Sequence, residues 1–249
     1  MIKHKLSNVV LKIADHMKDY PEVYYRVDST NDGSAVFNEA DQALEIAGRV
    51  DFLTYFNSCS VAKWKKYTNI QRIKLHLELA GDACVIQFVG ISHKDKNVSV
   101  LAEGQRLVGG VEKNGHLVFE IDAPATDKDI LGFVLQVRGK AQLFDAYYFT
   151  EIEEDAINPV KLALSTTTFK KEQYIVPNIE LVKREVLASD DPVAKAFHLF
   201  VVDNGCTLDA AALSDDGVTV LPNNNVGGAG GFARGMMEAL SSDGGFTHI

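Results

Sequence analysis

The sequence has few of the features that mark several large protein classes. Its three cysteines, Cys59, Cys84 and Cys206, are far apart and form no Cys-x-x-Cys pair. A disulfide framework is therefore not expected, and the thiols are predicted to be reduced, as in a cytoplasmic protein. No apolar run reaches the roughly 18 residues of a membrane-spanning helix, and the N-terminus lacks the apolar core of a signal peptide. The seven histidines are scattered without metal-ligand spacing, so none is assigned to catalysis.

An excess of basic residues is also missing. The chain carries 25 Lys and Arg against 34 Asp and Glu, a net charge of −9, which argues against a nucleic-acid-binding protein. A nucleotide-sugar ligand is still allowed, because local donors and a metal ion can offset phosphate charge. Hydrophobic residues make up 46% of the 249 residues, enough for one large folded domain or two ordinary ones.

The first half of the chain reads as short strands. Ile73, Leu75, Leu77 and Leu79 alternate with polar residues, which is typical of a half-buried strand. Similar runs follow at 84–88, 98–101, 117–121, 131–137 and 146–149. Regularly spaced short strands predict an antiparallel β-sandwich, jelly-roll-like in character. Upstream, Asn31-Asp32-Gly33-Ser34 reads as a turn, and residues 1 to about 25 have helical or mixed apolar spacing.

Two segments of this half, 52–57 and 62–67, are rich in aromatic residues. Tyr55 or Trp64 could form a platform on which a sugar stacks. Alternatively, these side chains seal the sandwich or its contact with the next domain, as aromatic residues usually do.

The second half has a different pattern, which begins after an acidic stretch at 151–155. We therefore expect a boundary here, between a domain at 1–155 and a domain at 156–249. Apolar runs at 160–167, 198–202 and 218–221 read as buried parallel strands, and 174–188 reads as a helix. This alternation predicts a doubly wound α/β sheet.

The most distinctive stretch is the glycine-rich run at 223–235. Four of the five residues 227–231 are glycine, which predicts a loop, and after it Phe232, Met236 and Leu240 recur on one face of a predicted helix. Glycines let backbone N–H groups approach a ligand, and a helix N-terminus favours an anion such as phosphate. The run matches neither Walker A nor a clean Gly-x-Gly-x-x-Gly. A tight turn without a ligand is the alternative.

Three polar elements follow the predicted strands, namely Thr168, Asp203 and the run at 223–231. In open α/β sheets ligands bind beyond the carboxyl ends of the strands, so the convergence predicts a nucleotide site. Asp203 could accept a hydrogen bond from a uracil N–H or a ribose hydroxyl. Alternatively, it could accept hydrogen bonds from nearby backbone N–H groups in an Asp-Asn-Gly turn. Arg234 could bind phosphate as a bidentate donor or form a structural ion pair. Asp215-Asp216-Gly217 is predicted to be a turn.

Residues 166–171, 201–205 and 223–235 together resemble family 2 glycosyltransferases of the GT-A fold. More narrowly, they are similar to bacterial galactofuranosyltransferases that extend cell-wall polysaccharide from UDP-galactofuranose. Residues 54–57 and 64–68 are similar to a segment in the N-terminal β-sandwich of that family.

This resemblance implies a sandwich followed by the first half of a GT-A domain. It implies that Thr168 and Asp203 contact the uridine, and that Asn225, Gly227 and Gly228 lie along the diphosphate with Arg234 nearby. Lys171 stands where the family usually has arginine, and it offers a point charge instead of a planar fork.

The family also has an Asp-x-Asp-type metal motif and a carboxylate base, which the resemblance places beyond Ile249. We therefore expect an N-terminal fragment that binds no metal and is inactive alone. The whole enzyme would use Mn²⁺ or Mg²⁺ for inverting transfer. Its partners would be a UDP-sugar donor and a glycan or lipid-linked glycan acceptor. Peripheral association with the inner face of the cell membrane and a homo-oligomer stay open.

Two other hypotheses compete with the glycosyltransferase hypothesis. A non-catalytic carbohydrate-binding or scaffold protein would act through the sandwich. A nucleotidyltransferase or a dehydrogenase would have a related sheet, but a dehydrogenase needs its glycines after the first strand, where Thr166-Thr167-Thr168 stands.

Overall fold

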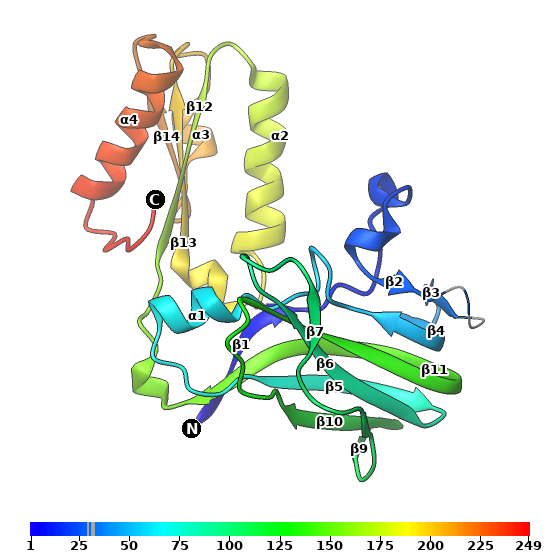
Figure 1. Ribbon diagram of the computed structural model, residues 1–249. Coiled ribbons are helices and arrows are strands. Elements are labelled where there is room, and N and C mark those ends of the chain that lie inside the picture. The colour runs from blue at the N-terminus through cyan, green and yellow to red at the C-terminus, as the bar shows by residue number, and fades with distance from the viewer. Residues whose placement is uncertain (29, 31–32) are drawn as a thin grey trace. The chain divides into compact units, whose positions relative to one another are not determined.

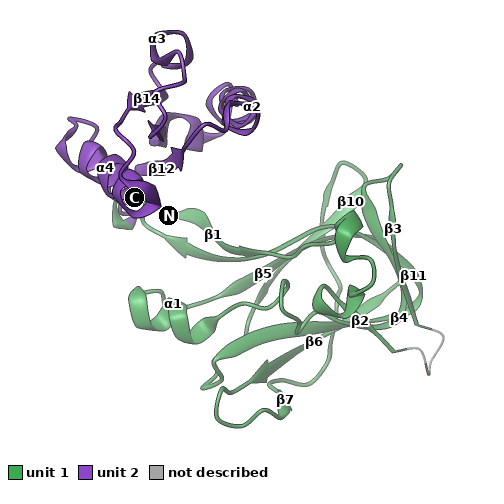
Figure 2. Ribbon diagram, turned by 90° about the horizontal axis from the view of Figure 1, so that it is seen from above, with its two compact units in different colours: residues 1–156 green, residues 157–249 purple. Residues whose placement is uncertain are grey.

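The computed structural model describes residues 1–28, 30 and 33–249. The predicted turn at 31–34 includes residues 31 and 32, which lie outside the described residues. Contacts divide the chain into two compact units, Met1–Ala156 and Ile157–Ile249, coloured separately in Figure 2.

The first unit is a mostly antiparallel β-sandwich, as the alternating pattern predicted. Its strands are β1 (Ile2–Asn8), β2 (Arg26–Val27), β3 (Ser34–Asn38), β4 (Ala43–Asp51), β5 (Lys74–Gly81), β6 (Cys84–Ile91), β7 (Val98–Val100), β8 (Gln105–Arg106), β9 (Val111–Lys113), β10 (His116–Asp122) and β11 (Ile130–Ile152). One short helix, α1 (Val61–Tyr67), lies between β4 and β5. The opening residues, for which the sequence indicated helical or mixed spacing, begin with strand β1, which pairs with β11, and continue with two single 3-10 turns at Asp15–Met17 and Pro21–Val23.

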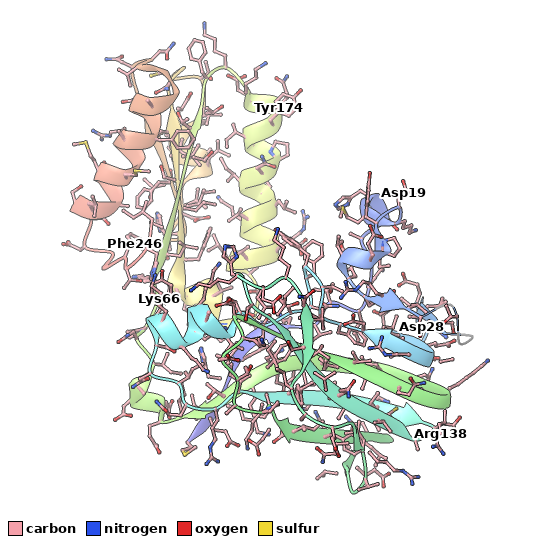
Figure 3. The ribbon with its side chains drawn as sticks, in the orientation of Figure 1. Asp19, Asp28, Lys66, Arg138, Tyr174 and Phe246 are labelled. Carbon is pink, nitrogen blue, oxygen red and sulfur yellow. The ribbon has the colours of Figure 1, made fainter. Side chains whose placement is uncertain are left out.

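The long strand β11 connects the two layers of the sandwich. Its first part pairs with β6, its second part pairs with β5, and β4 runs along both parts. The register with β4 shifts between Val137 and Ala141, beside Arg138, which Figure 3 labels. A bulge of this kind bends a strand and increases its twist, so a single strand serves both layers.

The core of the sandwich contains the apolar positions that alternate along the strands. Leu75, Leu77 and Leu79 are buried, together with Phe52, Phe133 and other large side chains. Trp64 packs against this core, which supports the packing role for that residue, whereas Tyr55 is 83% exposed.

The second unit is a parallel α/β unit with helices on both faces of its sheet (Figure 1). The sheet has the order β12 (Leu162–Thr168), β13 (Phe197–Asp203), β14 (Val218–Pro222). The helices are α2 (Glu172–Val182), which continues as a π-helical turn to Leu187, α3 (Ala210–Leu213) and α4 (Gly227–Ser241). Ile175 and Ile179 of α2 pack on one face with Leu199 and Val201, and Ala239 of α4 packs on the other face with Phe200.

The end of the chain extends this sheet on its other side. Ala163 donates its backbone N–H to the carbonyl of His248 at 2.9 Å, and Leu162 and His248 form a parallel bridge. The spatial order is therefore His248, β12, β13, β14. The chain moves in one direction from β12 to β14 and then returns past the amino end of β12.

Candidate functional site at the carboxyl ends of the parallel strands

The strand register brings the predicted polar positions to one edge of the sheet. Thr168 at the end of β12 lies opposite Asp203 at the end of β13, and Asp203 lies opposite Pro222 at the end of β14. The backbone N–H of Asn204 donates to the carbonyl of Thr168 at 2.9 Å, and that of Asn223 donates to the carbonyl of Asp203 at 2.9 Å. The ends of the three strands are thus joined directly.

Asp203 is fully buried and holds the loop that follows its own strand. Its Oδ1 accepts from the N–H of Gly205 at 2.9 Å, and its Oδ2 accepts from those of Thr207 at 2.6 Å and Leu208 at 2.8 Å. Both carboxylate oxygens are therefore engaged by backbone donors, as in the turn that the sequence analysis kept as an alternative. A contact between Asp203 and a uridine stays a prediction.

Asn204 is the centre of the hydrogen-bond network at this edge. Its buried amide donates to the carbonyl of Gly227 at 3.0 Å and to Thr167 Oγ1 at 3.4 Å, and its Oδ1 accepts from Asn223 Nδ2 at 2.8 Å. One side chain thus fixes the start of α4 against β12 and the loop after β14. Asn204 is not among the residues predicted from the sequence, although its place directly after a buried strand was a usable signal.

The start of α4 offers backbone donors at this edge. The helix begins at Gly227, so the glycines form its first turns and not a loop before it, which corrects the sequence-based expectation. Asn225 Oδ1 accepts from the N–H of Gly227 at 3.0 Å, and Gly227 has a φ of +74°. The N-cap residue Val226 provides no side-chain cap. First-turn N–H groups lack partners within a helix and lie at its positive end, so this terminus can bind an anion.

The glycines of α4 have separate roles. A Cβ on Gly228 would meet no heavy atom within 4 Å, so its surroundings are open. A Cβ on Gly231 or Gly235 would overlap Thr167 or Ser165 of β12, so these two glycines allow close packing of helix and sheet.

This packing decides which face of α4 is buried. Gly231, Gly235 and Ala239 face the sheet, whereas the apolar positions that predicted the helix are exposed, with Phe232 at 44% and Leu240 at 75%. The sequence pattern correctly indicated a helix, but its apolar stripe is not the buried face.

Two of the predicted binding residues, Lys171 and Arg234, lie on helices and not at the ends of the strands. Lys171 is the exposed N-cap residue of α2. Arg234 lies about two turns along α4 and pairs with Glu238 at 3.1 Å, which is the structural ion pair considered above.

The described residues include no group of three or more His, Cys, Asp or Glu side chains placed to hold a metal ion. The acidic pair Asp215-Asp216 lies in a turn, where Asp215 accepts from the N–H of Gly217 at 2.9 Å and pairs with Lys183 at 2.8 Å.

The fold and the site define a two-unit protein, with an antiparallel β-sandwich followed by a parallel α/β unit that gathers backbone donors at the carboxyl ends of its strands. The family model described as "Galactofuranosyltransferase 2 N-terminal" matches residues 6–150, more than half of the chain. The chain belongs to this family, and residues 6–150 are a galactofuranosyltransferase-related N-terminal domain.

A curated relative extends this similarity into the second unit. The chain is 26% identical over 249 residues to galactofuranosyltransferase GlfT2 of Mycolicibacterium smegmatis, with 95% of this chain and 37% of the relative covered. The chain thus spans little more than a third of the length of that relative, and the similarity supports a glycosyltransferase-related function.

Solved structures are similar only at a low level. The CBM22-1–GH10 modules of Clostridium thermocellum xylanase 10B, complexed with xylohexaose, align with a TM-score of 0.36, 9% identity and coverage of 82% of this chain and 38% of that one. The CBM22-1 xylan-binding domain of Paenibacillus barcinonensis Xyn10C aligns with a TM-score of 0.30, 9% identity and coverage of 61% and 95%. Scores this low carry no argument about function.

Among the described residues, no helix is long and apolar enough to cross a membrane.

Proposed function

We propose that this chain carries the donor-nucleotide site of a glycosyltransferase that uses a UDP-sugar, with UDP-galactofuranose as the expected donor. In this proposal the second unit is the first half of a GT-A domain. The observation that carries the proposal is the start of α4, which Asn204 holds against the ends of the parallel strands. The similarity of the chain to a galactofuranosyltransferase supports the choice of sugar.

The diphosphate in this proposal lies at the N-terminus of α4. The N–H groups of Gly228 and its neighbours and the helix dipole would stabilise its charge. The uridine would lie toward Thr168, because ligands in open α/β sheets bind beyond the carboxyl ends of the strands. Asp203 contributes by holding the loop 205–208 in place. Lys171 and Arg234 would reach the ligand only by moving their exposed side chains.

The transfer reaction belongs to the larger protein of which this chain would be a part. There the acceptor hydroxyl of a glycan or lipid-linked glycan would attack the anomeric carbon with inversion, and UDP would leave. A carboxylate base and Mn²⁺ or Mg²⁺ are expected for that step. We assign neither the carboxylate base nor a metal ligand to a described residue. The proposed role of this chain is therefore limited to binding the donor.

Calorimetric titration of the chain with UDP tests the proposal, with Gly228→Ala as the main variant. The new methyl group meets nothing in the fold, and in the proposal the diphosphate lies close to Gly228, so the methyl group would push it away from a backbone donor. Loss of one hydrogen bond to a charged group costs about 1.5–3 kcal/mol, so UDP affinity should fall by about tenfold or more. Ala233→Ser, on an exposed position of the same helix, is the matched control.

Two results would contradict the proposal. One is the absence of UDP binding by the folded chain, with and without Mg²⁺. The other is equal affinity of Gly228→Ala and the unmodified chain, because the ligand would then lie away from the start of α4.

A further inference from the structure

The β-sandwich contains a cavity of about 830 Å³ that the nucleotide site does not use. It lies over β5, β10 and β11, where His76 pairs with Tyr147 on one side and Glu120 on the other. Leu75 and Leu77 point into the core of the sandwich. Since side chains alternate along a strand, His76 and Glu78 lie on the opposite face, toward the cavity.

His76 is an unusual residue for the floor of this cavity. Its side chain is 6% exposed, yet neither ring nitrogen has a hydrogen-bond partner among the described residues. Nε2 lies 3.5 Å from Glu78 Oε1 and Nδ1 lies 3.7 Å from Glu120 Oε1, and both distances are long for hydrogen bonds. The ring stacks on Tyr147 with centroids 4.3 Å apart. Buried polar groups normally make hydrogen bonds of ordinary length, so a buried ring with only these two long carboxylate contacts needs an explanation.

The charges around the cavity are balanced. Lys113 pairs with Glu78 at 3.1 Å, and Lys3 pairs with Glu120. Burial raises the pKa of both carboxyl groups, but the lysine hydrogen bonds and charges outweigh this, so both pKa values lie below their ordinary range. Both groups are therefore ionised at neutral pH.

The balance of positive and negative side chains at the cavity favours an uncharged ligand. With Arg106 and Asp122, three cations and two carboxylates line the cavity, and a third carboxylate, that of Glu78, pairs with Lys113 beside it. An anionic ligand would gain little net attraction here, and the described residues offer no metal site. A hydroxyl group can donate to a carboxylate and accept from a lysine or arginine at the same time. Exposed Val108 and Val111 add apolar surface that suits the C–H faces of a sugar ring.

We propose that the cavity over His76, called the groove from here on, is a second binding site that takes a neutral, hydroxyl-rich ligand of the saccharide class. Lys113 and Glu120 hydrogen-bond the ligand, and His76 with Tyr147 forms the polar floor. The site lies entirely within the first unit, so it does not depend on the proposed nucleotide site.

Calorimetric titration of the full chain with a galactofuranose oligosaccharide, and separately with xylohexaose, tests this proposal. Saturable binding of at least one of these neutral glycans is expected. Glu120→Gln removes the charge but keeps the shape, and Lys113→Ala removes an exposed donor. Each should weaken binding by about tenfold, as expected for one hydrogen bond to a charged group.

Matched controls separate the groove from the general surface charge. Glu185→Gln and Lys94→Ala make the same changes at exposed positions outside the groove and should leave glycan affinity unchanged. Thermal unfolding of each variant shows whether it folds, and Lys113→Ala provides the test if Glu120→Gln does not. The imidazole ¹⁵N resonances of His76 should shift on glycan saturation, and saturating UDP should leave glycan binding intact.

Several outcomes would overturn the proposal. Failure of the folded chain to bind either glycan would show that the cavity holds only solvent. Equal loss of affinity in the control variants would place any binding elsewhere. Displacement of the glycan by inorganic phosphate would identify an anion site instead. None of these outcomes affects UDP binding by the second unit, so the two proposals fail independently.

Discussion

The contact between α4 and β12 yields a prediction that does not depend on any ligand. A Cβ on Gly235 would overlap Ser165 Oγ and would lie 3.1 Å from Ser165 Cβ and 3.3 Å from Val202 Cγ2. Gly235→Ala should therefore force the helix away from the sheet. Overpacking of this kind costs about 1–3 kcal/mol, while the better helix propensity of alanine returns up to about 1 kcal/mol. With the middle of the first range, about 2 kcal/mol, and the full gain of about 1 kcal/mol, the expected net loss is about 1 kcal/mol.

A second substitution makes this reasoning testable. Ser165 Oγ is buried and has no hydrogen-bond partner among the described residues. Removing an unsatisfied buried hydroxyl is neutral or stabilising, so Ser165→Ala alone should not destabilise the protein. In the double variant the overlapping oxygen is gone, and the remaining contacts need shifts of only a few tenths of an ångström. Stability should return to near its original value, with a coupling energy of at least about 1 kcal/mol.

Urea denaturation and hydrogen exchange together measure this cycle. Far-UV circular dichroism and the exchange of α4 amides report on the second unit. The single tryptophan, Trp64, lies in the first unit, so its fluorescence serves as an internal control. A Gly235→Ala protein as stable as the original, or a double variant as unstable as Gly235→Ala, would refute the close-packing explanation.

Three further predictions concern other parts of the structure. Asn204→Ala should destabilise the second unit by about 2 kcal/mol or more, because it removes three hydrogen bonds of a buried side chain, each worth about 0.5–1.5 kcal/mol, and amide exchange at the start of α4 should rise. In the native protein a thiol reagent should label Cys206 quickly and the buried thiols slowly, since burial raises the pKa of Cys59 to about 12 and that of Cys84 to about 11. Burial lowers the pKa of His198 below 6.5, so the unfolded state binds more protons and stability should fall as pH drops from 6.5 toward the folded pKa; His198→Gln should reduce this slope in pH-dependent denaturation.

Each of these predictions has a clear contrary result. Unchanged amide exchange in Asn204→Ala would show that the network does not hold the helix. Rapid labelling of all thiols under native conditions would show that the sandwich core opens easily. An unaltered pH slope in His198→Gln would assign the acid sensitivity to another group.

The elements of the fold were readable where the pattern is local. The alternation through Leu75 and Leu77 identified β5, and the apolar run before Asp203 identified β13. The polar residues after those strands were correctly placed at one edge, because parallel strands share their direction and their register. The opening residues were harder, since strand β1 is defined by its pairing with β11, far away in the sequence.

The candidate site was less predictable than the fold. Thr168 and the start of α4 were selected from the sequence, but Asn204 was not, because its importance comes from hydrogen bonds to Gly227 and Asn223, about twenty residues away. The burial of His76 was also hidden, since its strand pattern marks that position as facing away from the core.

The sequence by itself determined the kinds of elements, their order and the edge at which their polar ends meet, because side-chain periodicity and turn chemistry act over a few residues. Only the tertiary structure decided which face of α4 is buried. Glycine allows the closest approach of two backbones, and so the face with Gly231 and Gly235 packs on β12 while the larger apolar side chains are left exposed. Which face of α4 is buried therefore depends on Thr167 and Ser165, some sixty to seventy residues away. The sequence of α4 alone does not indicate it.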